Sequence, residues 1–286
     1  MEAASIVSIS SLKIPKFYLL GIATGLISVH LTLLSRANDA SLLGSSTLFW
    51  LAICSLIWSR RNVLSLDSGV FSSFSGILLI ALVLLKSLFV SGYDPFLRIS
   101  PLISALGIAL LASGFKGLKQ YWQEFLILCF LVPSPGMLTL LIDISTFTAK
   151  FAAVLLWYLG FEVARQGVYI QLPTGGVEVY PGCSGIESML HILGLAVIFL
   201  VMFPTSRLQK VLVPVVAAVV AFAVNGVRVA LMTILAASSN PQALEYWHKG
   251  DGSLIFSMFS VLILGLFCLF LLQQDGLEND DVEFES

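Results

Sequence analysis

Residues 253–272 read SLIFSMFSVLILGLFCLFLL, a run of twenty residues without a charged side chain. A run of this length and hydropathy is typical of a helix that crosses a lipid bilayer. The whole chain has the same character: 58% of its 286 residues are hydrophobic, 11% are charged and its mean hydropathy is +0.97. A water-soluble domain does not reach this composition. The sequence therefore predicts an all-α polytopic membrane protein.

Apolar runs of spanning length follow one another with only short polar gaps, which leaves no room for a separate soluble domain. We expect one integral membrane domain over residues 1–273, followed by an acidic, disordered cytoplasmic tail over residues 274–286. About eight transmembrane helices are expected. They are Phe17 to Leu34, Leu43 to Trp58, Gly69 to Ser91, Ile99 to Ser113, Tyr121 to Ile142, Ile186 to Phe203, Val211 to Ala237 and Ser253 to Leu272.

The positions of lysine and arginine predict the orientation, because short loops rich in these residues stay in the cytoplasm. With the N-terminus inside, the inner segments hold eight such residues and the outer segments hold five. If the apolar segment 137–160 also crossed, the loop with Arg207 and Lys210 would face outward. Since this segment carries Asp143 and Lys150, we expect it to lie in the outer interface or to form a re-entrant piece.

A change of pattern precedes the helix that begins near Ile186. Two β-prone runs, Val168 to Leu172 and Val177 to Tyr180, flank the turn Pro173-Thr174-Gly175-Gly176. They predict a short β-hairpin. Strands with open edges do not stand in lipid, so the hairpin should be extracytoplasmic. Its second strand leads directly into Pro181-Gly182-Cys183-Ser184-Gly185.

Cys183 is the candidate nucleophile. It lies on a turn before a helix N-terminus, where free backbone N–H groups and the helix dipole stabilise a thiolate and can hold an oxyanion. The alternative is an ordinary helix cap in which Ser184 caps the helix and the thiol is incidental. The other three cysteines lie in apolar runs and should act as small hydrophobes; they are Cys54, Cys129 and Cys268.

Arg228 lies within a predicted span, roughly two turns from its outer end. An arginine at that depth is costly and usually faces the protein interior, although snorkelling to the surface is the alternative. Asn225 is one turn earlier on the same face and could orient a guanidinium or a substrate amide. His248 follows in an outer loop and is suited to proton transfer near neutral pH. Thiol, guanidinium and imidazole together are the minimum set for acyl transfer through a thioester.

These residues resemble the motifs of the exosortases and archaeosortases, which carry Cys-Ser-Gly, Asn-x-x-Arg and His-x-x-x-Gly in that order. Here the motifs are Cys183-Ser184-Gly185, Asn225-Gly226-Val227-Arg228 and His248-Lys-Gly-Asp-Gly252. The resemblance covers about residues 160–272, and the Trp247-His248 pair is most similar to the cyanobacterial branch. Trp247 stands where the bacterial branch usually has Asp, which leaves Glu245 and Asp251 as candidate carboxylate partners of the histidine.

The resemblance implies a membrane-embedded cysteine protease or transpeptidase that needs no metal or organic cofactor. Its substrates would be secreted proteins with a C-terminal tripartite sorting signal of the PEP-CTERM kind. The protein would lie in the cell (inner or plasma) membrane, with its active site facing away from the cytoplasm. Cys183 would be acylated, and Arg228 would stabilise the oxyanion or hold the sorting motif. His248 would protonate the leaving amine and activate the acceptor, with Ser184, Gly185, Asn225 and Gly252 in support. The acceptor, a lipid or a glycan, is not identified by the motifs.

A membrane transporter or channel is the alternative of a different class, with Arg228 and Glu187 lining a polar pathway. Such proteins commonly carry internal repeats, and the two halves of this chain show none. A related hydrolase that cleaves without transfer is the second alternative. The sequence does not separate it from a transpeptidase, because the choice of acceptor depends on the cavity.

Overall fold

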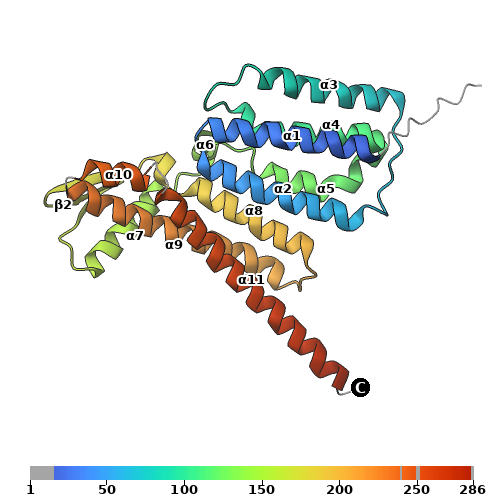
Figure 1. Cartoon of the computed structure of the whole chain (residues 1–286). Coiled ribbons are helices and arrows are strands. Elements are labelled where there is room, and N and C mark those ends of the chain that lie inside the picture. Colours follow the sequence, from blue (N-terminus) through green and yellow to red (C-terminus); the bar gives the residue numbers. More distant parts are fainter. Residues whose placement is uncertain (1–15, 239, 249–251, 285–286) are drawn as a thin grey trace, which may run out of the picture. The chain divides into compact units, whose positions relative to one another are not determined.

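The computed structural model describes residues 16–238, 240–248 and 252–284 (Figure 1). The chain divides into two compact units, residues 1–132 and residues 133–286. Within the described residues, seven helical segments are long and apolar enough to cross a membrane. A small sheet of three short strands is the other regular structure. The expected all-α polytopic membrane fold with a short β-hairpin is therefore confirmed.

The first unit is helical throughout its described part. Its elements are α1 (Lys16–Arg36), α2 (Ala40–Arg60), α3 (Val70–Ser87), α4 (Phe96–Gly117), the 3₁₀ turn η1 (Leu118–Tyr121) and α5 (Trp122–Cys129). A buried polar chain ties three of the helices together. The Trp50 indole N–H donates to Nδ1 of His30 over 3.2 Å, so Nε2 carries the imidazole proton and donates to the Leu97 carbonyl oxygen over 3.0 Å.

One predicted crossing, Tyr121 to Ile142, is not a continuous helix. Helix α5 ends at Cys129, and the next helix, α6, spans Pro135–Leu141 after a break that contains Pro133. Proline lacks a backbone N–H and clashes with the preceding turn, so two prolines this close end a helix. Instead, the fourth candidate span covers Phe96–Cys129, with non-helical geometry at Gly114. The described residues thus hold seven candidate spans, where the hydropathy pattern predicts eight.

The second unit is built around one long helix, α9 (Gln209–Ala237). The first half of α9 packs with α8 (Ile186–Met202) and α11 (Gly252–Phe284) in one apolar cluster. Its second half packs with α7 (Ser145–Tyr158) and the sheet in another. A short helix, α10 (Pro241–His248), then leads from α9 towards α11. Residues of the central part of α9 therefore lie between two separately packed regions.

The sheet has the antiparallel order β1-β2-β3, formed by Ala164–Gln166, Tyr169–Leu172 and Gly175–Glu178. The last two strands are the expected hairpin, with Leu172 opposite Gly175. The first strand was not expected, because three residues are too few to show an alternating pattern. Thr174 in the hairpin turn donates its hydroxyl to the Ala237 carbonyl oxygen over 2.8 Å. This hydrogen bond fixes the sheet to the end of α9.

Segment 137–160 holds most of α6 and all of α7, and neither is among the seven candidate spans. One face of α7 is buried against α9, whereas Phe147, Trp157 and Tyr158 on the helix are exposed. Its placement in the membrane interface stays a prediction. Helical geometry in α11 continues to Phe284, into the acidic segment 274–286, whose cytoplasmic location also stays a prediction.

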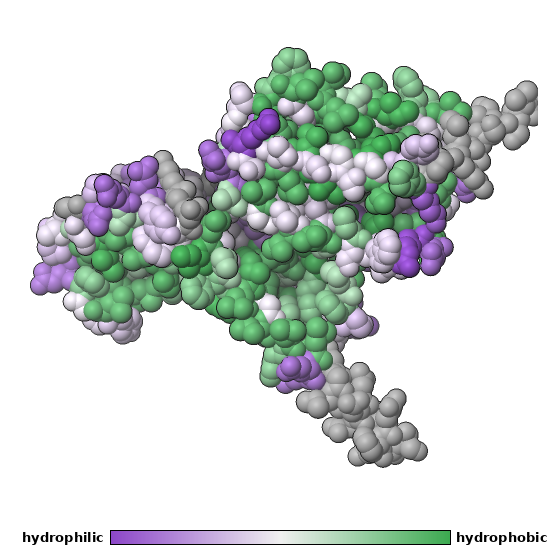
Figure 2. Space-filling model, viewed as in Figure 1, coloured by the Kyte–Doolittle hydropathy of each residue, from purple (hydrophilic) through white to green (hydrophobic). Residues whose placement is uncertain are grey.

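The surfaces of the long helices are largely apolar, as Figure 2 shows for α3 and α11. Exposed residues on α3 include Phe71, Phe74 and Leu85. In the second unit, hydrophilic residues gather at the end that carries α10 and β2. The apolar surfaces suit contact with lipid, and the hydrophilic end suits contact with water.

Candidate active site

The site is built on a tight elbow between the sheet and α8. After β3 the backbone stays extended at Tyr180, turns through the 3₁₀ helix η2 (Pro181–Cys183), and enters α8 through Gly185. Gly185 has a φ of 92°, a left-handed conformation that residues with a side chain rarely adopt. The elbow therefore places Cys183 one short turn before a helix N-terminus, as the sequence predicts.

Two neighbouring helices hold the elbow in place. Asn225 of α9 donates its amide N–H to the Cys183 carbonyl oxygen over 3.1 Å. Thr148 of α7 donates its hydroxyl to the Ser184 carbonyl oxygen over 2.7 Å. A Cβ atom on Gly185 would lie 2.5 Å from Nδ2 of Asn225, so the glycine also gives Asn225 access to the backbone. The nucleophile turn is thus fixed by side chains from two helices.

Ser184 acts within the elbow rather than in the cavity. Its buried hydroxyl donates to the Pro181 carbonyl oxygen over 2.7 Å and accepts from the Ile186 backbone N–H over 3.4 Å. Ser184 therefore accepts a hydrogen bond from the first residue of α8 while the half-buried Cys183 lines the cavity, so one role does not exclude the other.

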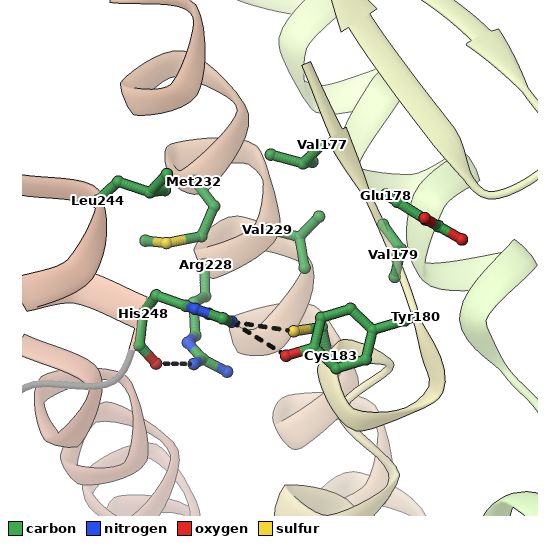
Figure 3. A pocket seen from close by; sticks show the side chains of 10 residues that line it. All are labelled: Val177, Glu178, Val179, Tyr180, Cys183, Arg228, Val229, Met232, Leu244 and His248. Carbon is green, nitrogen blue, oxygen red and sulfur yellow. Dashed lines mark hydrogen bonds between the residues drawn. The ribbon is translucent and has the colours of Figure 1, made fainter. Parts of the chain in front are cut away.

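His248, the last residue of α10, contacts the thiol directly. Its Nε2 lies 3.2 Å from Sγ of Cys183 (Figure 3). This distance permits proton transfer between sulfur and imidazole. Of the two candidate carboxylate partners of His248, Glu245 is exposed. Asp251 lies outside the described residues.

Arg228 of α9 lies on the same side of the cavity as the thiol and the imidazole. Its Nη2 donates to the His248 backbone carbonyl oxygen over 2.7 Å. Its Nε is buried and has no hydrogen-bond partner within the described part of the chain. The guanidinium therefore fixes the end of α10 and keeps donor capacity beside the cavity. Arg228 faces the protein interior here and does not snorkel.

Tyr180 belongs to the same cluster, although sequence analysis did not single it out. Its hydroxyl lies 3.4 Å from Nε2 of His248, and the two rings meet edge to face at 6.4 Å. A hydrogen bond to the Cys183 sulfur, together with burial, raises the pKa of Tyr180 to about 12. The phenol therefore stays protonated at neutral pH. Its position as the last residue before Pro181-Gly182-Cys183 was the available signal.

The four polar side chains meet at the wall of a cavity of about 130 Å³. The rest of the lining is mostly aliphatic and comes from β3, α9 and α10, as Figure 3 shows. These aliphatic residues are Val177, Val179, Val229, Met232 and Leu244. Within the described residues, no group of three His, Cys, Asp or Glu side chains is placed to hold a metal ion. The arrangement can bind an apolar group beside a thiol and an imidazole.

The structure brings together four of the predicted residues, namely Cys183, Asn225, Arg228 and His248. Gly252 instead begins α11, where a Cβ atom would lie 2.8 Å from the ring of Tyr246. It shapes the junction of α10 and α11. Thr148 was missed as a support, since its position in an apolar segment points equally to simple packing.

The two backbone amides next to the sulfur are used within the turn. The Cys183 N–H donates to the Tyr180 carbonyl oxygen over 2.8 Å, and the Ser184 N–H donates to that of Pro181 over 3.3 Å. Both close the 3₁₀ turn. The expectation that free N–H groups at the helix N-terminus hold an oxyanion therefore does not extend to these two amides, and side chains at the cavity wall are further candidates for that role.

A comparison with protein families matches most of the chain. The family described as Transmembrane exosortase matches residues 37–265. This range includes the whole elbow and the helices α7 and α9 that hold it. No curated protein and no solved structure matches the chain.

Proposed function

The chain belongs to the transmembrane exosortase family, and on that premise we propose that it is a membrane-embedded cysteine transpeptidase. The family consists of sorting-related membrane proteases and transpeptidases whose substrates carry sorting signals. The finer proposal is that this chain cleaves a C-terminal signal of the PEP-CTERM kind from secreted proteins. It would then transfer the new C-terminus to a lipid or glycan acceptor. The Trp247-His248 pair supports placing it in the cyanobacterial branch.

The observation that carries this proposal is the contact of 3.2 Å between Sγ of Cys183 and Nε2 of His248 at the cavity wall. A thiol and an imidazole at this distance form the nucleophile and base of acyl transfer. The other cysteines provide the contrast, since Cys268 is buried in an apolar cluster and Cys54 and Cys129 lie on α2 and α5.

The chemistry proceeds through a thioester. His248 takes the thiol proton, and the Cys183 thiolate attacks the carbonyl carbon of the substrate peptide, so that a C–S bond forms and the carbonyl π electrons move to oxygen. The C–N bond then breaks as the imidazolium gives its proton to the departing amine. An acceptor nucleophile passes its proton to His248 and attacks the thioester, which releases the thiolate.

Arg228 contributes in two ways. Its hydrogen bond to the His248 carbonyl oxygen holds the end of α10 against the thiol. Its positive charge at the cavity wall favours the negative oxygen that develops during attack. The cavity itself, with its aliphatic lining, would receive an apolar part of the substrate next to the cleaved bond.

The site is proposed to face outside the plasma membrane. The distribution of lysine and arginine supports this orientation in the eight-crossing arrangement, which places Arg60, Lys116 and Arg207 in the cytoplasm. That arrangement requires the chain from α5 to α6 to return to the outer face after Lys116. Labelling with a membrane-impermeant thiol reagent tests it. Cys183 should react from the outer face, and reaction from the inner face alone would contradict the orientation.

The function is tested with Cys183→Ala and Cys183→Ser. Both proteins should reach the membrane at normal abundance, but their substrates should keep their C-terminal helices. Alanine has no nucleophile, and serine is far less ionised than cysteine near pH 7. Wild-type protein should form an acyl adduct that hydroxylamine releases from Cys183, with Cys129→Ala as the control that still forms it. Normal processing by Cys183→Ala would overturn the enzyme and favour a transporter.

A further inference from the structure

A thioester enzyme needs hydrogen-bond donors where the carbonyl oxygen becomes negative, because removing one such donor typically lowers rates by about 100- to 1000-fold. The two backbone amides nearest to the sulfur do not meet this need. The Cys183 and Ser184 N–H groups are bound to carbonyl oxygens of their own turn. Side chains that line the cavity are therefore candidates for these donors.

The polar side chains at the cavity wall are few. Arg228, His248 and Tyr180 can donate hydrogen bonds there, whereas Glu178 ends in a carboxylate that accepts them. The proton of His248 is required by the leaving amine. Arg228 already uses Nη2 to hold the His248 carbonyl oxygen over 2.7 Å. Tyr180 is the neutral donor that remains.

The position of Tyr180 is fixed on both sides of its ring. Its backbone carbonyl oxygen accepts the Cys183 N–H over 2.8 Å, so the tyrosine and the nucleophile belong to one rigid turn. A Cβ atom on Gly182 would lie 2.8 Å from Cε2 of the ring, so glycine leaves the space that the ring occupies. The opposite edge meets the His248 imidazole at an interplanar angle of 87°.

The hydroxyl of Tyr180 is directed at the reacting groups. It lies 3.4 Å from the same imidazole nitrogen that contacts the thiol at 3.2 Å (Figure 3). The Cys183 side chain raises the pKa of Tyr180 to about 12, as expected for a phenol that stays protonated beside a thiolate. The residue is also 46% exposed, so an incoming substrate can reach it.

We propose that Tyr180 is a further catalytic residue, whose phenolic O–H donates a hydrogen bond first to the Cys183 thiolate and then to the oxyanion of the tetrahedral intermediate. The proposal rests on the thioester function proposed above. During attack the negative charge moves from sulfur to the carbonyl oxygen, and the hydrogen bond follows it. The phenol keeps its proton throughout. His248 remains the group that gives a proton to the leaving amine.

The ring contacts alone could mean that Tyr180 is only a packing residue, and Tyr180→Phe separates the two roles. Phenylalanine keeps the ring against Gly182 and His248 and removes only the hydroxyl. Alkylation of Cys183 by iodoacetamide, followed by mass spectrometry across a pH series, reports on the thiolate without any substrate. For the variant, the midpoint of this profile should move upward by about one to two pH units. Thioester formation should slow by about ten- to a hundredfold, with KM little changed.

Fluorinated tyrosine at position 180 provides a second measurement that keeps both ring and hydroxyl. A phenol donates only while protonated, so a phenol with a lower pKa should lose thioester formation at a lower pH than the wild-type residue, whose pKa is about 12. A packing role would give the same pH profile for both. This test remains decisive if Tyr180→Phe fails to fold.

Tyr158→Phe is the matched control, because Tyr158 is an exposed tyrosine at the end of α7. It should leave alkylation and acylation unchanged. If Tyr180→Phe also matches wild type in both measurements, the role of Tyr180 is refuted while the thioester function stands. If Cys183→Ala still processes substrate, the function itself is refuted, and the alkylation profile still decides whether Tyr180 interacts with the thiolate.

Discussion

Two arginines in long apolar helices, one in each unit, have different partners. Arg98, near the start of α4, is 3% exposed, and its Nη2 lies 3.9 Å from a carboxylate oxygen of Asp39. Arg228, in α9, is paired with no carboxylate among the described residues. It donates to the His248 backbone carbonyl oxygen and lines the cavity beside the thiol.

The difference separates a charge that stabilises a fold from a charge that acts on a ligand. A carboxylate neutralises the guanidinium of Arg98 within its own unit, as Glu124 does for Arg60. A carbonyl oxygen accepts a hydrogen bond from Arg228 but brings no full negative charge. Arg228 therefore keeps its electrostatic effect for whatever enters the cavity.

Substitution by lysine should have its largest effect at Arg228. Arg228→Lys keeps the charge but loses the planar arrangement of donors that holds the His248 carbonyl oxygen and still faces the cavity. Substrate processing should fall about 100-fold or more, with normal abundance in the membrane. The matched substitution Arg98→Lys should leave processing near the wild-type level. Equal losses for both variants would contradict the distinction between the two arginines.

Filling the cavity should have the next largest effect. Arg228 lines this cavity, whereas Arg98 is paired with a carboxylate. Val177→Phe adds a ring to the aliphatic lining on β3. Processing should fall by about ten- to a hundredfold, mainly through KM, since a pocket discriminates strongly by size. Alkylation of Cys183 by small iodoacetamide should change little. A parallel loss of alkylation would indicate that the elbow itself had moved.

Loss of the amide that holds the nucleophile turn should cost less. Asn225→Ala removes the hydrogen bond to the Cys183 carbonyl oxygen and leaves that buried acceptor without its side-chain partner. We expect processing to fall about tenfold. Thr148→Val is the comparison on the other side of the turn, and the double variant should show whether the two supports act together. Full activity of Asn225→Ala would assign Asn225 to helix packing.

Asp39→Asn should have the smallest effect on activity and should act on stability alone. It removes the negative charge beside the buried guanidinium of Arg98. The free energy of unfolding should fall by about 1–3 kcal/mol, measured by thermal unfolding in detergent. Processing per folded molecule should stay the same. A selective loss of processing would show that the first unit takes part in the reaction.

Hydropathy alone was enough to predict the membrane fold, because lipid requires helices of nearly constant length and composition. It predicted one continuous helix at 121–142, where Pro133 and Pro135 divide the apolar run into two short helices. The mean hydropathy of a long segment changes little when it contains a proline, but a proline removes a backbone hydrogen bond and can end the helix. The strand Ala164–Gln166 was missed for a related reason, since it is defined by its partner strand rather than by its own pattern.

The sequence predicted those site residues whose side chains are chemically distinctive and rare in their surroundings. A thiol in a glycine-rich turn, an arginine at membrane depth and a loop histidine each stand out, and Cys183, Arg228 and His248 do lie together. Tyr180 and Thr148 do not stand out, because tyrosine and threonine are common in strands and in helices. Their contacts arise from how η2, α7 and α10 fold around the elbow, which local sequence does not specify.

The small aliphatic recess beside Cys183 has a consequence for chemical biology. Its volume of about 130 Å³ suits a short, uncharged electrophile with a compact aliphatic group, placed so that the warhead meets Sγ. Such a probe would report target occupancy in intact cells without a peptide substrate. An activity-based probe of this shape would therefore also read out which cells in a culture carry folded, competent protein.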